Sequence, residues 1–186
     1  QCHTLGMWNS RKEIAEAIRS VLGKDLLAVY DKSADALAKV HKEQVTNGYL
    51  IGARPDEDEV LENGHRFRVD WEEGQKTGFF LDQRDNRKLF GKYAKGRKVL
   101  NTFCYSGGFS VYALKAGAAR VDSVDVSEKA VRLAKENMMR NGGDGNEGYF
   151  VMDTFDFFKS HSGEHDLIVL DPPAFARSKQ AVPRAL

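Results

Sequence analysis

The feature that most constrains this chain is a strict alternation of strand-like and helix-like segments from about residue 82 onward. Such an alternation is typical of a parallel sheet whose strands are joined by crossover helices. The expected strands cover residues 98–103, 121–125, 149–152 and 167–170, and the expected helices cover 82–94, 108–116, 127–141 and 154–159. We therefore expect an α/β fold with a Rossmann-like sheet, of which about four strands are present.

Residues 1–73 follow a different pattern and are expected to form a small α+β domain. A helix should start at a capping box, carry an apolar stripe and end at Gly23. A strand is expected over residues 26–30 and a short helix over 33–40. The capping box and the stripe are formed by Ser10, Glu13, Ile14, Ile18, Val21 and Leu22.

The dipeptide Asn63-Gly64 is typical of a type I′ turn. Apolar and polar residues alternate after it, from Arg66 to Trp71, which predicts a β-hairpin with one solvent-facing side. The acidic run at residues 56–59 just before it is interpreted as a solvated loop.

The second domain is expected over residues 74–186. Because doubly wound sheets usually have about five to seven strands, we expect this domain to be truncated at its C-terminus. A sheet without its last strands exposes an unpaired edge, so association or marginal stability is expected.

The composition describes an ordinary globular protein, with 41% hydrophobic residues, 30% charged residues and a net charge of +1. It gives no overall basic excess that would indicate nucleic-acid binding. No apolar run approaches the roughly 20 residues of a membrane helix, and the first residues lack a signal-peptide core. The two cysteines, Cys2 and Cys104, form no metal-binding pattern, so reduced thiols, no metal and a cytoplasmic location are expected.

The segment VLNTFCYSGGFSVYAL combines a strand, a turn and a helix start, which is where an open α/β sheet binds its ligand. The small residues Ser106, Gly107 and Gly108 let a ligand approach the backbone. The next expected strand ends in Asp125, whose carboxylate could accept hydrogen bonds from both hydroxyls of a ribose. Together these features predict an adenosine-containing ligand.

A dinucleotide site would need tight glycines in this turn. Phe103 and Tyr105 occupy the positions where those glycines would stand, so pyrophosphate binding is disfavoured.

Two further carboxylates follow the third and fourth expected strands. Asp153 could accept from an adenine amino group, and Asp171 begins a stiff loop with Pro172 and Pro173 that would suit a planar base. Each aspartate alone could be a simple turn residue. Three carboxylates at successive strand ends, however, suit a sulfonium cofactor that carries a free ammonium group.

These segments together resemble the class I large-subunit ribosomal RNA methyltransferases, in particular the 5-methylcytosine (methyltransferase I) type. The resemblance covers residues 62–179, and more weakly 1–61, which are similar to the middle domain of that family. It rests on the motifs N-x-F-C-Y-S-G-G-F-S, V-D-V-S, D-T-F and D-P-P-A-F-A, preceded by GQKTGFFLDQRDNR.

The resemblance implies S-adenosyl-L-methionine as cofactor and ribosomal RNA as partner. It implies that the glycine loop lines the cofactor, that Asp125 holds the ribose, that Asp153 faces the adenine and that Asp171 lies near the methyl group and the target base. It also implies that residues 76–87 lie over the cofactor. Lys76, Gln83 and Arg84 are the candidate contacts there, the alternative being a solvated helix start. The cofactor loop comprises Ser106, Gly107 and Gly108.

Methylation at carbon 5 of cytosine needs a cysteine thiolate that adds to the neighbouring ring carbon. The family places that cysteine on a later strand, in a Ser-Cys-Ser-like motif that this chain does not contain. Neither Cys2 nor Cys104 occupies the position, and Cys104 is expected to be a buried packing residue. The catalytic nucleophile is therefore unassigned, the chain alone is expected to be inactive, and an amino-terminal RNA-binding domain of the PUA kind is also expected to be missing.

A local basic stripe lies between residues 84 and 98, with Phe90 and Tyr93 interleaved. It could engage RNA phosphates, or it could be a solvated helix face with its aromatics turned inward. Its members are Arg84, Arg87, Lys88, Lys92, Lys95, Arg97 and Lys98.

The sequence therefore predicts methyl transfer to a base of large-subunit ribosomal RNA, with carbon 5 of cytosine as the leading candidate. Purine N-methylation by the same fold remains open, because a D-P-P-x-F loop also resembles enzymes that need no cysteine. A non-catalytic adenosine-binding or RNA-binding module also remains open. The modified nucleotide and the oligomeric state are not determined by the sequence.

Overall fold

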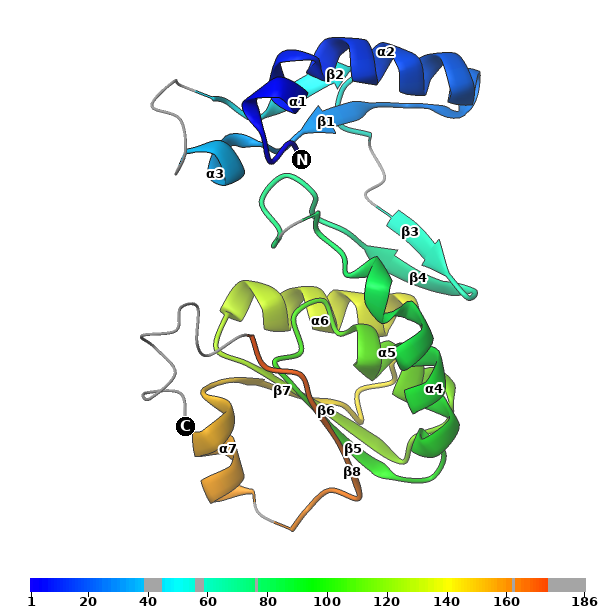
Figure 1. Cartoon of the computed structure of the whole chain (residues 1–186). Helices are drawn as coiled ribbons and strands as arrows, with labels where there is room; N and C mark the ends of the chain where they lie inside the picture. Colours follow the sequence, from blue (N-terminus) through cyan, green and yellow to red (C-terminus); the bar gives the residue numbers. More distant parts are fainter. Residues whose placement is uncertain (39–44, 56–58, 76, 162, 174–186) are drawn as a thin grey trace. The chain divides into compact units, whose positions relative to one another are not determined.

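A computed structural model of the chain describes residues 1–38, 45–55, 59–75, 77–161 and 163–173 (Figure 1). The chain forms two compact units that alternate along the sequence. The first unit comprises Gln1–Asp58 and Val69–Phe79, and the second comprises Glu59–Arg68 and Phe80–Leu186. The expected division after residue 73 stays a prediction, but the structure groups the hairpin with the second unit.

The first unit has an antiparallel pair of strands, β1 (Val29–Asp31) and β2 (Gly48–Ile51). The predicted helix is present as α2, which follows Ser10 and ends at Gly23. The remaining elements are α1 (Leu5–Asn9), α2 (Arg11–Leu22), η1 (Gly23–Asp25) and α3 (Ala34–Leu37). The rest of the helix expected over 33–40 and the acidic residues 56–58 lie outside the described residues.

One expectation about α2, the capping box, was wrong. The Ser10 side chain makes no capping hydrogen bond. The apolar stripe is largely exposed, from 37% at Ile18 to 82% at Val21, and Ala15 is the buried residue of the helix. Because the sheet of this unit has only short strands, it offers α2 little surface against which to bury the stripe.

The second unit contains a parallel sheet in the order β7-β6-β5-β8. Every strand and helix predicted from residue 82 onward is present, with each end within two residues of its expected place. The strands are β5 (Lys98–Thr102), β6 (Arg120–Asp125), β7 (Gly148–Val151) and β8 (Leu167–Leu170). The helices are η2 (Leu81–Gln83), α4 (Arg84–Ala94), α5 (Gly108–Lys115), α6 (Glu128–Arg140) and α7 (Thr154–Ser160).

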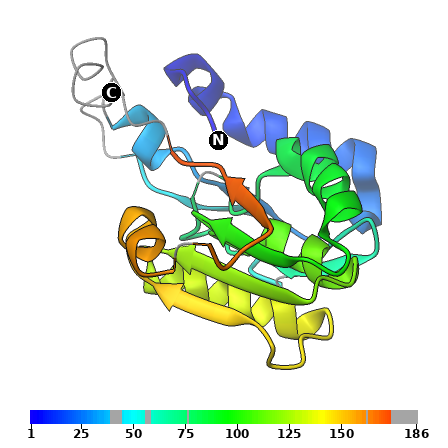
Figure 2. The ribbon, with the colours of Figure 1, turned by 90° about the horizontal axis from the view of Figure 1, so that it is seen from below.

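Helices α4, α5 and α6 cover one face of this sheet, and α7 lies on the other face (Figures 1 and 2). On the α7 face, Leu100, Val124 and Phe157 form a buried cluster. On the α6 face, Cys104 packs with residues of that helix. The winding direction changes between β5 and β8, which are hydrogen-bonded neighbours. The carboxyl ends of these strands therefore form the topological switch point at which open α/β sheets bind ligands.

The predicted hairpin pairs β3 (Glu59–Glu62) with β4 (His65–Arg68). Asn63 and Gly64 have φ of 52° and 82°, as a type I′ turn requires. The free edge of β4 is bonded by two side-chain amides, Asn137 in α6 and Asn141 at its C-terminal end.

Each amide makes a two-point contact with the strand backbone. Asn141 accepts from Arg66 N at 3.0 Å and donates to Arg66 O at 2.7 Å. Asn137 accepts from Arg68 N at 2.7 Å and donates to Arg68 O at 3.4 Å. Four residues of helix rise about 6 Å, close to the roughly 6.6 Å of two strand residues, so both amides fit at once.

We predict that Asn137→Leu lowers the free energy of unfolding by about 1–3 kcal/mol, because Arg68 N and Ser106 O lose a buried partner. Urea denaturation measures the change. Asn86→Leu is the matched control, since Asn86 is an exposed helix residue bonded only to Gln83 among the described residues. An equal effect of both substitutions would contradict the role of the amide.

Candidate functional site

The loop between β5 and α5 has an unusual backbone. Phe103, Tyr105 and Gly107 all have positive φ, at 52°, 45° and 72°. The sequence did not indicate this backbone conformation at residues 103 and 105, where a dinucleotide site would have glycines. Both residues adopt the left-handed conformation, at a cost of roughly 1–2 kcal/mol each for a residue with a Cβ. The disfavoured pyrophosphate binding stays a prediction.

Three contacts hold this strained loop in place. Tyr105 N donates to Asp125 Oδ2 at 3.1 Å, and Cys104 N donates to Val124 O at 3.0 Å. The Tyr105 ring packs edge-to-face on Phe80 at a centroid distance of 5.5 Å. The loop conformation is therefore set by the end of β6 and by the residues that precede α4.

The glycines of the loop are also required by packing. A Cβ on Gly107 would lie 2.8 Å from Ala134 Cβ of α6. A Cβ on Gly108 would lie 2.9 Å from Arg87 Cδ of α4. Small residues at 107 and 108 are thus needed for packing, whether or not they line a cofactor as predicted. Ser106 itself is buried.

Arg87 does not belong to the surface stripe in which the sequence placed it. Its guanidinium forms a buried, two-point ion pair with Glu62, with N–O distances of 2.8 and 2.7 Å. Tyr112 donates to the same carboxylate at 3.1 Å, and Arg87 also donates to Phe80 O at 3.0 Å. Arg87 is therefore a link between the hairpin and α4, and its charge is not available to a phosphate.

The three predicted carboxylates stand at or just after the ends of three parallel strands of one sheet, β6, β7 and β8. Asp125 accepts from Tyr105 N and, at 3.0 Å, from Ser127 N. Asp153 is the N-cap of α7 and accepts from Phe155 N at 2.8 Å through Oδ1. Asp171 follows β8 and is exposed.

The turn and cap roles considered from the sequence are thus present at Asp125 and Asp153. These hydrogen bonds do not use all the acceptor positions of the two side chains, because an ionised carboxylate has about four lone-pair sites. The roles of these residues, and of Asp171, Pro172 and Pro173, toward a ligand stay predictions.

The segment expected to cover the cofactor is only partly described, and Lys76 lies outside the described residues. Phe80 brings the start of the segment to the loop through its contact with Tyr105. The Gln83 side chain accepts from Asn86 at 2.8 Å, and Arg84, 60% exposed, lies 3.3 Å from Asp85. Gln83 and Arg84 are therefore engaged within their own helix region, and their contact with a cofactor stays a prediction.

Cys104 has the environment expected of a packing residue. It is 5% exposed and lies in a cluster with Val131 and Ala134. Burial, assisted by the nearby Asp125 carboxylate, raises the pKa of the Cys104 thiol far above its ordinary value. A thiol held protonated in this way is a poor nucleophile.

The outward face of α4 carries aligned cations. Arg84, Lys88 and Lys92 are not buried and follow one another at four-residue intervals, so they lie along one side of the helix about 6 Å apart. Lys88 and Lys92 make no ion pair with any described residue. Of the two aromatics, Phe90 packs on Phe109 at 5.6 Å, whereas Tyr93 is 55% exposed. The alternative in which both aromatics turn inward therefore holds for Phe90 only.

Metal-binding groups and membrane helices are both absent from the residues that the structure describes. Within them, no three His, Cys, Asp or Glu side chains gather in a group that could hold a metal ion. No helix of this part of the chain is long and apolar enough to cross a membrane.

We predict that Gly107→Ala lowers the free energy of unfolding by about 2–4 kcal/mol, since it combines left-handed strain with a clash against α6. Gly96→Ala provides the control. Gly96 has a similar φ of 70°, but nothing lies within 4 Å of the position that a Cβ would take there, so this variant reports the strain alone. Thermal unfolding of both variants measures the difference, and equal losses would contradict the close approach of α6.

The chain is similar to known methyltransferases. The profile of a family described as S-adenosylmethionine-dependent methyltransferase matches residues 22–184. A ribosomal RNA large subunit methyltransferase I from Aeromonas hydrophila is 42% identical over 175 residues, which cover 91% of this chain and 44% of the relative.

Two solved structures are similar in fold and sequence. A methyltransferase in complex with S-adenosylhomocysteine superposes with a TM-score of 0.76 at 34% identity, covering 94% of this chain and 45% of the other. An S-adenosylmethionine-dependent methyltransferase from Streptococcus mutans gives a TM-score of 0.76 at 31% identity, covering 96% and 48%. The chain spans a little under half the length of these proteins.

Proposed function

Because the chain belongs to the S-adenosylmethionine-dependent methyltransferase family, we propose that its second unit binds S-adenosylmethionine for the methylation of a base in large-subunit ribosomal RNA. The family resemblance found in the sequence is confirmed by the comparisons. The observation that carries the proposal is the position of Asp125. Asp125 is the last residue of β6. Its carboxylate accepts a hydrogen bond from Tyr105 N in the strained glycine loop, at the switch point of the sheet.

The residues at this edge fit such a cofactor. Asp125 would accept from the ribose hydroxyls, and Asp153 has its second oxygen, Oδ2, without a hydrogen-bond partner among the described residues for an adenine amino group. Asp171, exposed after β8, adds negative charge that suits a sulfonium. The cofactor would supply the methyl group, and this chain would bind and orient it.

For the target base we propose carbon 5 of cytosine, methylated in the cytoplasm. The relatives named ribosomal RNA large subunit methyltransferase I support the RNA class, and the motif resemblance supports the base. Cys104 is buried and its thiol pKa is raised, so it does not suit the thiolate role that this chemistry needs. Purine N-methylation is the alternative favoured by the Asp171-Pro172-Pro173 loop, and identification of the methylated base that the protein forms separates the two.

We predict that Asp125→Ala weakens the binding of S-adenosylhomocysteine about 5- to 150-fold, the equivalent of roughly 1–3 kcal/mol for a lost hydrogen bond to a charged group. Isothermal titration calorimetry measures the affinity. Glu164→Ala removes an exposed charge at the opposite end of the sheet and should leave it unchanged. Since Asp125 also holds the loop, far-ultraviolet circular dichroism must show that the variant is folded. Undiminished binding by folded Asp125→Ala would refute the site.

The aligned cations of α4 are the proposed contact with RNA phosphates. We predict that the double substitution Lys88→Ala and Lys92→Ala lowers the slope of log affinity against log salt concentration by about 1.4, since each single-strand phosphate contact contributes roughly 0.7. Binding of a single-stranded ribosomal RNA fragment is measured at several salt concentrations. The control pair, Arg132→Ala and Lys159→Ala, removes two charges from α6 and α7. An equal change of slope in the two double variants would contradict the proposed RNA contact of α4.

A further inference from the structure

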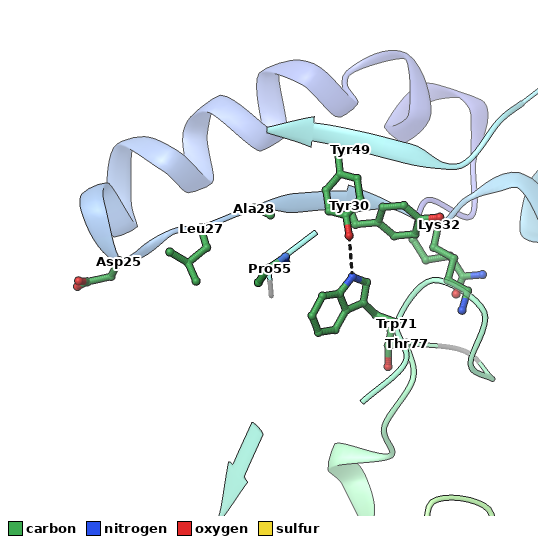
Figure 3. A pocket seen from close by; sticks show the side chains of 10 residues that line it. Asp25, Leu27, Ala28, Tyr30, Lys32, Tyr49, Pro55, Trp71 and Thr77 are labelled. Carbon is green, nitrogen blue, oxygen red and sulfur yellow. Dashed lines mark hydrogen bonds between the residues drawn. The ribbon is translucent and has the colours of Figure 1, made fainter. Parts of the chain in front are cut away.

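The first unit contains a pocket of about 440 Å³ that the cofactor proposal does not use. Its walls include the rings of Tyr30, Tyr49 and Trp71, with Asp25 and Lys32 also lining it (Figure 3). We propose that this pocket holds one unpaired base of the RNA strand, stacked on these rings. The proposal rests on RNA as the partner of the protein, as proposed above.

The rings come from separate segments that the fold brings together. Tyr30 in β1 and Tyr49 in β2 are cross-strand partners, so their side chains share one face of the two-stranded sheet. Their centroids lie 4.8 Å apart with the planes tilted by 56°. Trp71 comes from the segment that follows the hairpin and completes the aromatic wall.

A chain of hydrogen bonds fixes two of these rings. Trp71 Nε1 donates to Tyr49 Oη at 3.1 Å (Figure 3). Tyr49 Oη in turn donates to Glu72 Oε1 at 2.6 Å. Arg54 pairs with the other oxygen of Glu72 at 2.9 Å. The polar groups of the rings are thereby bonded in the wall, and the rings are held in place before a ligand arrives, which reduces the ordering cost of binding.

The charges and size of the pocket suit a nucleotide. Asp25 and Lys32 lie at opposite ends, with the rings between them (Figure 3). A base has π faces for the rings and donors on its edge for a carboxylate, and its phosphates are attracted by an ammonium group. The volume lies within the roughly 300–1,000 Å³ typical of small-molecule sites. Single-stranded RNA is commonly recognised by stacking splayed bases on aromatic side chains in this way.

The chain offers a direct optical test, because Trp8 and Trp71 are its two tryptophans. Trp8→Phe leaves Trp71 as the single tryptophan emitter, inside the pocket. We expect a short single-stranded RNA to change the Trp71 emission in a saturable manner. The same oligonucleotide with abasic central positions should bind at least fivefold more weakly. Equal affinity for both oligonucleotides, or no change of emission, would overturn the proposal.

Substitution of Tyr30 locates the effect, because its ring lies outside the hydrogen-bond chain described above. In the Trp8→Phe background, Tyr30→Leu should weaken binding about 5- to 150-fold, the range that corresponds to roughly 1–3 kcal/mol per stacked base. Tyr30→Phe keeps the ring, and its affinity for the RNA should lie within about twofold of that of the Trp8→Phe protein. Unchanged binding by a folded Tyr30→Leu variant would also overturn the proposal. The abasic comparison needs no pocket substitution and decides the matter if that variant does not fold.

Failure here is distinguishable from failure of the proposed function. Binding of S-adenosylhomocysteine to the same Trp8→Phe protein is measured by calorimetry without RNA. Cofactor binding without a base-dependent emission change refutes the pocket alone. A base-dependent change without cofactor binding supports the pocket and counts against the cofactor site.

Discussion

The second unit depends on the buried ion pair between Glu62 and Arg87. Burial of two charges is unfavourable unless each is fully paired, and removal of one partner from such a pair typically costs about 3–5 kcal/mol. Here both carboxylate oxygens accept from the guanidinium, while Tyr112 and the Phe80 carbonyl provide further bonds. The pair joins β3 to α4 and α5, so the hairpin becomes part of the sheet unit although the chain leaves that unit again at residue 69.

This constraint extends to the candidate site through the stem of Arg87. The stem lies against Gly108, the first residue of α5, and leaves no space for a Cβ there. On the other side, Ala134 of α6 presses equally closely on Gly107. The loop between β5 and α5 is thus fixed from two helices, which explains how it can hold Phe103 and Tyr105 in left-handed conformations. The fixed loop in turn orients the Asp125 carboxylate before any ligand binds, because that carboxylate accepts a hydrogen bond from the loop.

The periodic features of the fold could be predicted from the sequence, and the features that depend on single long-range pairs could not. The strands and helices after residue 82 were found because hydrophobic periodicity is a local signal. Arg87 was placed in the surface stripe because its neighbours are cationic, and nothing local shows that Glu62, 25 residues earlier, takes its charge. The largely exposed apolar stripe of α2 shows a further limit, since periodicity predicts a helix face but not the partner that would cover it.

The candidate site shows the same division. The strand-end aspartates were predictable, because the carboxyl ends of parallel strands share one edge of a sheet. The left-handed Phe103 and Tyr105 were not, because residues with a Cβ rarely adopt that conformation without tertiary support. The amides of Asn137 and Asn141 were missed as well. Their four-residue spacing is visible in the sequence, but the strand that it matches is contributed from about 70 residues away.

The near-zero net charge of the chain conceals differences in how its cations are paired. Several arginines of the second unit are paired with acids, as in the pairs Arg66–Glu59, Arg68–Glu136 and Arg120–Asp122. A cation already paired with a carboxylate gains little from a phosphate, because it must first give up its partner. Cations that are unpaired within the described chain and aligned along a rigid helix, such as Lys88 and Lys92 of α4, can instead release counterions from RNA at little conformational cost. For the RNA binding proposed above, the relevant quantity is therefore the number of unpaired cations on one surface and not their excess over acids.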